Sequence, residues 1–71
     1  MTDSVYAVSE IVGTSTESWE KAAANAVERA SKTLRDLRVA EVMELDMTIE
    51  EGTVSSYRAR VKVSFKYESR G

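Results

Sequence analysis

Residues 39–67 decide the fold, and they read VAEVMELDMTIEEGTVSSYRARVKVSFKY. Apolar and polar side chains alternate on both sides of Gly52, which is typical of two β-strands joined by a turn. The first run and the turn hold five acids, Glu41, Glu44, Asp46, Glu50 and Glu51. The second run holds four bases, Arg58, Arg60, Lys62 and Lys66. An acidic strand followed by a basic strand predicts an antiparallel hairpin stabilised by opposite charges.

The charge pattern also restricts how the two strands pair. Residues paired directly in an antiparallel ladder point to the same face of the sheet, so the apolar side chains of the two strands must lie opposite one another. One register places Asp46 opposite Arg58 and Glu44 opposite Arg60, and a second places Glu44 opposite Arg58. Each opposite-charge pair contributes about 0.2–1 kcal/mol. Both registers need an odd number of loop residues, and we predict a three-residue loop containing Gly52.

The N-terminal half of the chain predicts a strand followed by a helix. Residues 5–12 read VYAVSEIV, a run rich in β-branched and aromatic side chains that ends at Gly13. Ser15 or Thr16 is expected to cap a helix over residues 17–37. One stripe of this helix is apolar at spacings of three and four residues and comprises Trp19, Ala23, Ala26, Val27, Ala30 and Leu34.

These elements predict an α+β fold of order β-α-β-β, in which a three-stranded antiparallel sheet wraps on one helix and residues 1–71 form a single domain. On the sheet face away from the helix, we expect Val5, Ala7, Ile11 and Val42 to lie among the charges. A chain of 71 residues buries only about 60–65% of its unfolded surface. Small domains are usually stabilised by disulfides, a metal or oligomerisation. Because the chain has no Cys, we expect self-assembly.

The composition argues against several classes of function. The chain has no His, which is the commonest general base, and no nucleophile–base pair is visible, so we do not expect an enzyme. A net charge of −2 does not indicate a nucleic-acid-binding protein. No apolar run approaches the ~20 residues of a membrane span, and residues 1–8 lack the basic start of a signal peptide. We expect a soluble cytoplasmic protein.

Two groups of carboxylates are candidates for chemistry. Glu44 and Asp46 share one face of a strand and are spaced for acid–base work, but the bases opposite them lower carboxyl pKa values, which favours an ion-pair face. Glu50 and Glu51 beside Gly52 offer the oxygen ligands that Ca²⁺ prefers. The spacing of an EF-hand is missing there, and a polar turn is the simpler interpretation.

Three stretches of the chain resemble the dodecin family: EIVGTS at residues 10–15, Arg29-Ala30 in the Ala-rich helix, and VKVSFK at residues 61–66. The similarity covers nearly the whole chain. It implies a β-α-β-β shell subunit, twelve copies of which, built from trimers, form a hollow homododecamer with sheets inside and helices outside. Members of the family are non-enzymatic proteins that bind, store and quench flavins such as riboflavin and FMN, and some also bind coenzyme A.

Three positions depart from the pattern of flavin-binding dodecins. The resemblance implies a flavin-stacking Trp where this chain has Val39, a ring-binding Gln where it has Arg58, and in bacterial members an Arg where it has Asp46. Loss of the aromatic platform removes roughly 1 kcal/mol or more beyond buried area. Our hypothesis is that Asp46 and Arg58 pair across the strands and occupy or close the former flavin site. Lys66 stands where the family's coenzyme A contact has a basic residue.

Four short motifs resemble a calcium-binding branch of the family: Ser18-Trp19-Glu20, Arg38-Val39-Ala40, Asp46-Met47 and Tyr57-Arg58. The candidate metal ligands are the carboxylates Glu41, Glu44, Asp46, Glu50 and Glu51. We therefore predict a small-ligand binding and storage protein with impaired flavin binding and with calcium or another ion as the candidate ligand. Two alternatives stay open: a flavin-storage dodecin, and a structural shell or interaction module without a ligand.

Overall fold

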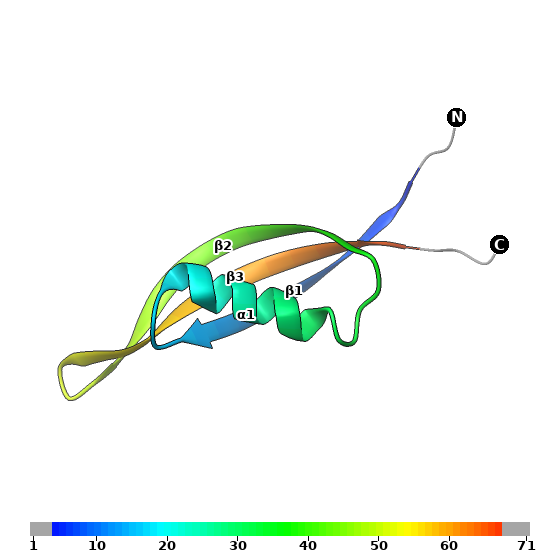
Figure 1. Ribbon diagram of the computed structural model, residues 1–71. Coiled ribbons are helices and arrows are strands. Elements are labelled where there is room, and N and C mark those ends of the chain that lie inside the picture. Colours follow the sequence, from blue (N-terminus) through cyan, green and yellow to red (C-terminus); the bar gives the residue numbers. More distant parts are fainter. Residues whose placement is uncertain (1–3, 68–71) are drawn as a thin grey trace.

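The fold is a three-stranded antiparallel sheet with one helix on one of its faces. The computed structural model describes residues 4–67. The elements are β1 (Tyr6–Ser15), α1 (Trp19–Ala30), β2 (Leu37–Glu50) and β3 (Thr53–Lys66). β3 is the central strand, paired antiparallel with β1 on one side and with β2 on the other, and the β2–β3 hairpin extends well beyond α1 (Figure 1). The predicted fold class and element order are confirmed.

The hairpin turn is shorter than predicted. Glu50 pairs with Thr53, and the two residues between them have positive φ angles, 51° at Glu51 and 76° at Gly52. Two such residues form a type I′ turn, whose twist matches that of the strands. The predicted three-residue loop is therefore wrong. The extra residue that the prediction placed in the loop lies instead in a β-bulge at Ser55, where the register of the hairpin shifts by one.

The shift at Ser55 restores the charge pairing expected from the sequence. Thr48 pairs with Ser56, and its hydroxyl lies 2.6 Å from the Ser55 hydroxyl and 2.7 Å from the Ser56 hydroxyl. Beyond this bulge, Asp46 lies opposite Arg58 and Glu44 opposite Arg60. The first of the two registers predicted is confirmed for this segment.

A second bulge lies at Met43 and reverses the alternation of side chains along β2. On its two sides, Leu45 pairs with Ala59 and Val42 pairs with Val61. Ala59 and Val61 are fully buried beneath α1, so Val42 and Leu45 both belong to the helix-covered face. The expectation that Val42 lies on the opposite face is wrong because the simple alternation did not include this extra residue.

β1 is longer than predicted, and the side chains that face the helix are those predicted to face away from it. It continues through Gly13 to Ser15, and a Cβ atom at Gly13 would lie only 2.1 Å from the carbonyl oxygen of Ala22. This close approach puts Gly13 under the helix, and with it Ile11 and Ala7. The expected placement of Ala7 and Ile11 on the far face is therefore wrong. The far face of β1 instead presents Tyr6, Val8, Glu10 and Val12.

The helix is shorter than predicted at both ends. Its N-cap is Ser18, whose Oγ accepts a hydrogen bond from the Lys21 N–H at 3.0 Å, so the predicted caps Ser15 and Thr16 are wrong. The helix ends at Ala30, and the Ser31 hydroxyl donates to the Glu28 carbonyl at 2.7 Å. Such side-chain bonds favour turns over further helix. Residues 31–35 form turns, and the chain enters β2 through Asp36 with a φ angle of 57°.

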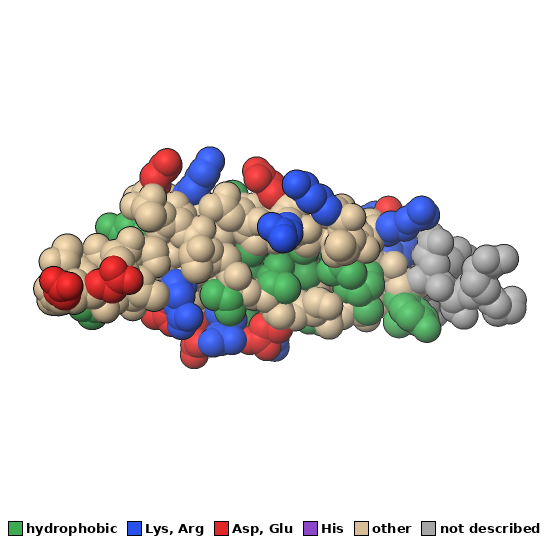
Figure 2. Space-filling view, turned by 90° about the horizontal axis from the view of Figure 1, so that it is seen from below, with side chains coloured by type: hydrophobic (Ala, Val, Ile, Leu, Met, Phe, Trp, Pro, Cys, Tyr) green, Lys and Arg blue, Asp and Glu red, His purple; other side chains and the backbone are tan. Residues whose placement is uncertain are grey.

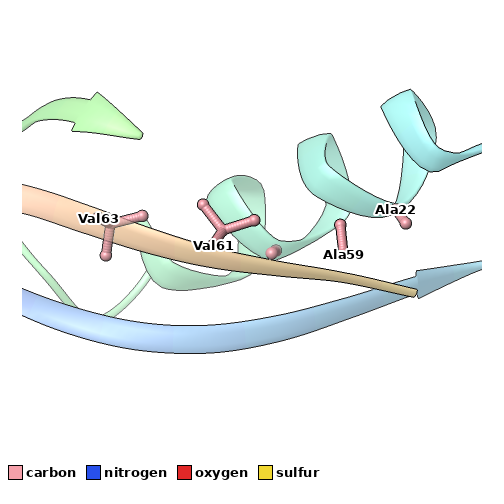
Figure 3. Close-up of a cluster of buried hydrophobic side chains, with 5 residues drawn as sticks. Ala22, Ala59, Val61 and Val63 are labelled. Atoms are coloured by element: carbon pink, nitrogen blue, oxygen red, sulfur yellow. The ribbon is translucent and has the colours of Figure 1, made fainter. Parts of the chain in front are cut away.

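The core between α1 and the sheet is made of small side chains. Figure 3 shows Ala59, Val61 and Val63 following one another along β3 on the side of α1, with Ala22 at the Ala59 end, and Ala26 completes the buried cluster. Many larger apolar side chains are exposed in a single chain, namely Val5, Tyr6, Val8, Val12, Val39, Val42, Met43, Leu45, Met47, Ile49, Val54 and Tyr67. Figure 2 shows a gathering of apolar side chains between charged margins. Among residues 4–67, no helix has both the length and the apolar character that a membrane crossing requires.

Candidate functional site

The candidate site lies on the sheet face opposite α1, which we call the open face. Because Ala59, Val61 and Val63 of β3 are buried under the helix, the intervening residues of this central strand point to the open face. These residues include the four bases Arg58, Arg60, Lys62 and Lys66. A row of cations therefore runs along the middle of the open face, and the acids of β1 and β2 lie on its two sides.

The shortest charged contact of the open face joins Asp46 on β2 to Arg58 on β3. The Arg58 Nε donates to Asp46 Oδ1 at 2.7 Å, and Nη2 donates to Oδ2 at 2.8 Å. This bidentate geometry matches the planar guanidinium to the planar carboxylate. The hydrogen bond from Arg58, with the positive charges of Arg58 and Arg60, lowers the pKa of Asp46, and the carboxylate in turn raises the pKa of Arg58. Both groups are thus held in their charged forms.

Further ion pairs continue along the open face. Arg60 donates from Nε to Glu44 at 3.1 Å and approaches Glu10 of β1 at 3.5 Å through Nη1. Lys62, in the next open-face position, is paired in register with Glu10 on one side and Glu41 on the other. These side chains are exposed, so such pairs contribute little individually, about 0–1 kcal/mol. The acids and bases of the open face therefore balance one another in charge. Carboxylates that are paired with bases are poor proton acceptors, so this arrangement does not favour acid–base catalysis.

The three positions that the resemblance assigns to flavin contacts, Val39, Asp46 and Arg58, do not all lie together in one chain. Asp46 and Arg58 form a single pair, whereas Val39 lies opposite Ser64, six positions further along β3. At roughly 3.3 Å per residue this separation is about 20 Å. Val39 is exposed, and on the far side of Ser64 lies Val8, so this part of the open face is apolar. The exposed Tyr6 occupies the next open-face position of β1, opposite Lys66.

Lys66 lies at the opposite end of β3 from the hairpin turn. It pairs with Tyr6 of β1, and its main-chain N–H donates to the Asp36 carbonyl at 3.2 Å. The neighbouring surface hollow is lined by Arg35, Phe65 and Tyr67 among others. The residues around this hollow thus include two bases, Arg35 and Lys66, one acid, Asp36, and the aromatic residues Phe65 and Tyr67.

The candidate metal ligands are distributed over β2 and the turn rather than gathered. Glu44 and Asp46 bond to arginines, Glu41 is paired in register with Lys62, and Glu50 and Glu51 lie exposed at the hairpin tip. Within the part of the chain from residue 4 to residue 67, no three acidic side chains come close enough together to hold a metal ion. Acidic side chains are visible at the hairpin end of the molecule in Figure 2.

Three contacts between α1 and the sheet were not anticipated from the sequence. The Trp19 indole N–H donates to the main-chain carbonyl of Asp46 at 3.0 Å, and its ring meets that of Tyr57 edge to face with centroids 5.0 Å apart. Asn25 of α1 donates from its side-chain amide to the Thr14 carbonyl at 2.9 Å. The apolar spacing of Trp19 predicted packing against the sheet, but no sequence pattern indicates a bond to a strand carbonyl.

The sequence of the chain is similar to those of known proteins. The sequence model of the family described as Dodecin matches residues 5–68. The curated protein calcium dodecin of Mycobacterium tuberculosis is 51% identical over 63 residues, which cover 89% of this chain and 89% of that protein.

Solved structures show the same fold. The dodecin of Streptomyces coelicolor aligns with a TM-score of 0.90 at 40% identity, covering 97% of this chain and 99% of its own. The calcium dodecin of Mycobacterium tuberculosis, described as a calcium-chelating antigen with a novel calcium-binding site, aligns with a TM-score of 0.80 at 47% identity, covering 94% and 96% of the two chains.

Proposed function

The chain belongs to the dodecin family, and from this premise we propose that it is a non-enzymatic binding and storage subunit of a hollow homododecamer built from trimers, with impaired flavin recognition. Calcium or a similar ion is its proposed ligand. The proposal rests on the side chains of the open face and on the acids of the hairpin.

The observation that carries the proposal is the bidentate pair of Asp46 and Arg58. In flavin-binding relatives the resemblance implies a neutral amide at the position of Arg58, with its hydrogen bonds available to the flavin ring. Here two donors of the guanidinium are already engaged at 2.7 and 2.8 Å. A flavin would have to separate the pair and cover both charges with an uncharged ring, which is unfavourable unless each charge finds a new partner.

The layout of the site supports assembly. Val39 and the Asp46–Arg58 pair are about 20 Å apart along the strands, which is longer than an isoalloxazine ring. A ligand that touches both positions therefore needs Val39 from one copy and the pair from another. The exposed valines and methionines of a single chain support the same conclusion, because apolar patches of this kind usually mark interfaces.

The proposed ion site is the hairpin tip. Calcium takes six to eight oxygen ligands, and one chain does not gather three acids among its described residues. Glu44 and Asp46 already bond to arginines, whereas Glu50 and Glu51 lie at the exposed end of the hairpin. Copies related by a symmetry axis would bring several such carboxylates together, and the name of the calcium dodecin relative makes calcium the first ion to test.

Lys66 is the proposed contact for the phosphates of a coenzyme A-like ligand. Arg35 lines the same hollow and would add a second positive charge, while Phe65 and Tyr67 offer rings for stacking. We expect Lys66→Ala to weaken binding of coenzyme A, measured by calorimetry, while Lys62→Ala on the same strand leaves that binding unchanged.

The absorbance spectrum of the purified protein and a riboflavin titration test the loss of flavin recognition. We expect a colourless protein, and riboflavin fluorescence that is not quenched in a saturable way when protein is added. A yellow protein, or stoichiometric quenching, would show instead that the chain is a flavin-storage dodecin.

Calorimetry with Ca²⁺ tests the ion site once light scattering has established the mass of the assembly. We expect a saturable heat of binding that is lost in the double variant Glu50→Gln/Glu51→Gln. The matched control Glu28→Gln, on the outer side of α1, should keep it. Absence of binding in the unmodified protein would favour a structural shell without an ion.

A further inference from the structure

Two side-chain hydrogen bonds tie α1 to the sheet within residues 4–67, and both end in the same row of the sheet. Trp19 donates to the carbonyl of Asp46 on β2, and Asn25 donates to the carbonyl of Thr14 on β1. Thr14 and Asp46 are the two register partners of Arg58. The helix is thus bonded to both flanking strands at the position where the open face carries its bidentate ion pair.

Both bonds reach strands that need such support. β1 and β2 are the edges of the sheet, and an edge strand has backbone groups without a strand partner. β2 is also poorly covered by α1, as the exposure of Val42, Leu45 and Met47 shows. The Trp19 ring adds a second contact in this region, because it packs edge to face on Tyr57, the residue next to Arg58.

We propose that Trp19 and Asn25 are positioning residues that clamp the row Thr14–Arg58–Asp46 from the helix side and so set the geometry of the Asp46–Arg58 ion pair on the opposite face. The relevance of this row to ligand binding rests on the function proposed above. The clamp itself is a property of the free protein. It makes the outer helix a place where ligand access to the open face is adjusted without contact with the ligand.

The physical basis is the fixing of two edge strands relative to the central one. Arg58 and Asp46 keep their two parallel hydrogen bonds only while β2 and β3 keep their spacing and twist at this row. Removing one of the two helix bonds should raise the opening equilibrium of the row about fivefold, the factor that corresponds to loss of one ordinary hydrogen bond. The other end of the sheet, where Tyr6 pairs with Lys66, should not respond.

Hydrogen exchange measured by mass spectrometry on the assembled protein tests the clamp. The variants are Trp19→Phe, which keeps a ring, and Asn25→Ala, which keeps a good helix former. We expect about fivefold faster exchange in peptides that contain Thr14, Asp46 and Arg58, with unchanged exchange near Tyr6. Val61→Ala serves as the control, because a buried core valine should loosen the sheet as a whole. Uniformly faster exchange in all three variants would overturn the proposal.

The fluorescence of Trp19, the chain's single Trp, gives an independent test that needs no ligand. Breaking the clamped pair with Arg58→Gln should shift Trp19 emission and increase its quenching by acrylamide. Arg60→Gln breaks ion pairs on the same face outside the clamped row and should leave both unchanged. Equal responses of the two variants, or none, would contradict the clamp. Riboflavin and calcium binding are not measured in either experiment, so the clamp and the proposed function can fail separately.

Discussion

On the α1 side of the sheet, Ala59 and Val61 of β3 are fully buried, whereas Arg58 and Arg60 of the same strand keep 39% of their side-chain surface exposed on the open face. Around Gly13, the covered face fits so closely against the helix that an added methyl group has no room. The open face instead carries charged side chains that form exposed ion pairs. The comparison teaches that the fold depends on the covered face, while the exposed ion pairs of the open face can be replaced at little cost to the fold.

Gly13→Ala should have the largest effect, because it acts on the covered face. The new methyl group would meet the Ala22 carbonyl at 2.1 Å and the Ala26 side chain at 2.8 Å, so helix and strand must separate. Overpacking of this kind costs about 1–3 kcal/mol or more in unfolding free energy. The change is measured by denaturant unfolding. Gly52→Ala, which meets no atom within 4 Å, should cost only about 1–2 kcal/mol through its positive φ. A larger loss at Gly52 would reverse our interpretation of the two glycines.

Val61→Ala should come next. It removes two buried methyl groups from the centre of the core and leaves a cavity, at a cost of about 2 kcal/mol in unfolding free energy. The matched change is Val12→Ala on the open face of β1, where the side chain is 43% exposed. We expect it to cost less than about 0.5 kcal/mol in the isolated subunit, measured by thermal unfolding. Equal costs would mean that the two faces are not as different as described.

Val39→Trp should change ligand binding rather than folding. Introduced into the double variant Asp46→Arg/Arg58→Gln, in which the excluding pair is absent, it returns an aromatic platform to the open face, and stacking contributes roughly 1 kcal/mol, or about fivefold in riboflavin affinity relative to that double variant. The affinity is measured by fluorescence titration, and Val12→Trp on the same face serves as the control for non-specific stacking. If both variants bind equally, Val39 has no special place in the site.

The pH dependence of stability should show the smallest effect. The pKa of Asp46 is lowered, chiefly by its hydrogen bond with Arg58. A lowered native pKa stabilises the fold above the ordinary value of 3.8, and this stabilisation is lost as the pH falls below that value through the native pKa. Chemical unfolding across acidic pH should therefore show a steeper loss in the unmodified protein than in Asp46→Asn. Parallel curves would mean that the pair contributes nothing measurable.

The sequence predicted those parts of the molecule in which apolar and polar side chains recur at regular spacing. The element order and the pairing of Asp46 with Arg58 follow from alternation and from opposite charges on two strands. The bulges at Ser55 and Met43 could not be found in this way, because an alternating pattern does not show where an extra residue is accommodated. The side of β1 that faces the helix was predicted wrongly because Gly13 was interpreted as a strand end rather than as a contact point.

Of the candidate site, only the ion pairs between β2 and β3 could be predicted from the sequence. Complementary charges on β2 and β3 identified the ion pair, but Glu10 of β1 and the bonds of Trp19 and Asn25 depend on how distant elements meet. A single Trp at a helix start carries no signal that its N–H will reach a strand carbonyl. The 20 Å between Val39 and Asp46 likewise became visible only with the strand register.

Riboflavin titration of the unmodified protein beside the double variant Asp46→Arg/Arg58→Gln tests the central claim most directly. The proposed claim is that the Asp46–Arg58 pair excludes flavin, the ligand that the family resemblance implies. We predict no saturable quenching of riboflavin fluorescence by the unmodified protein and saturable quenching by the double variant, both in assemblies of the same mass by light scattering. Tight, stoichiometric quenching by the unmodified protein would contradict the account.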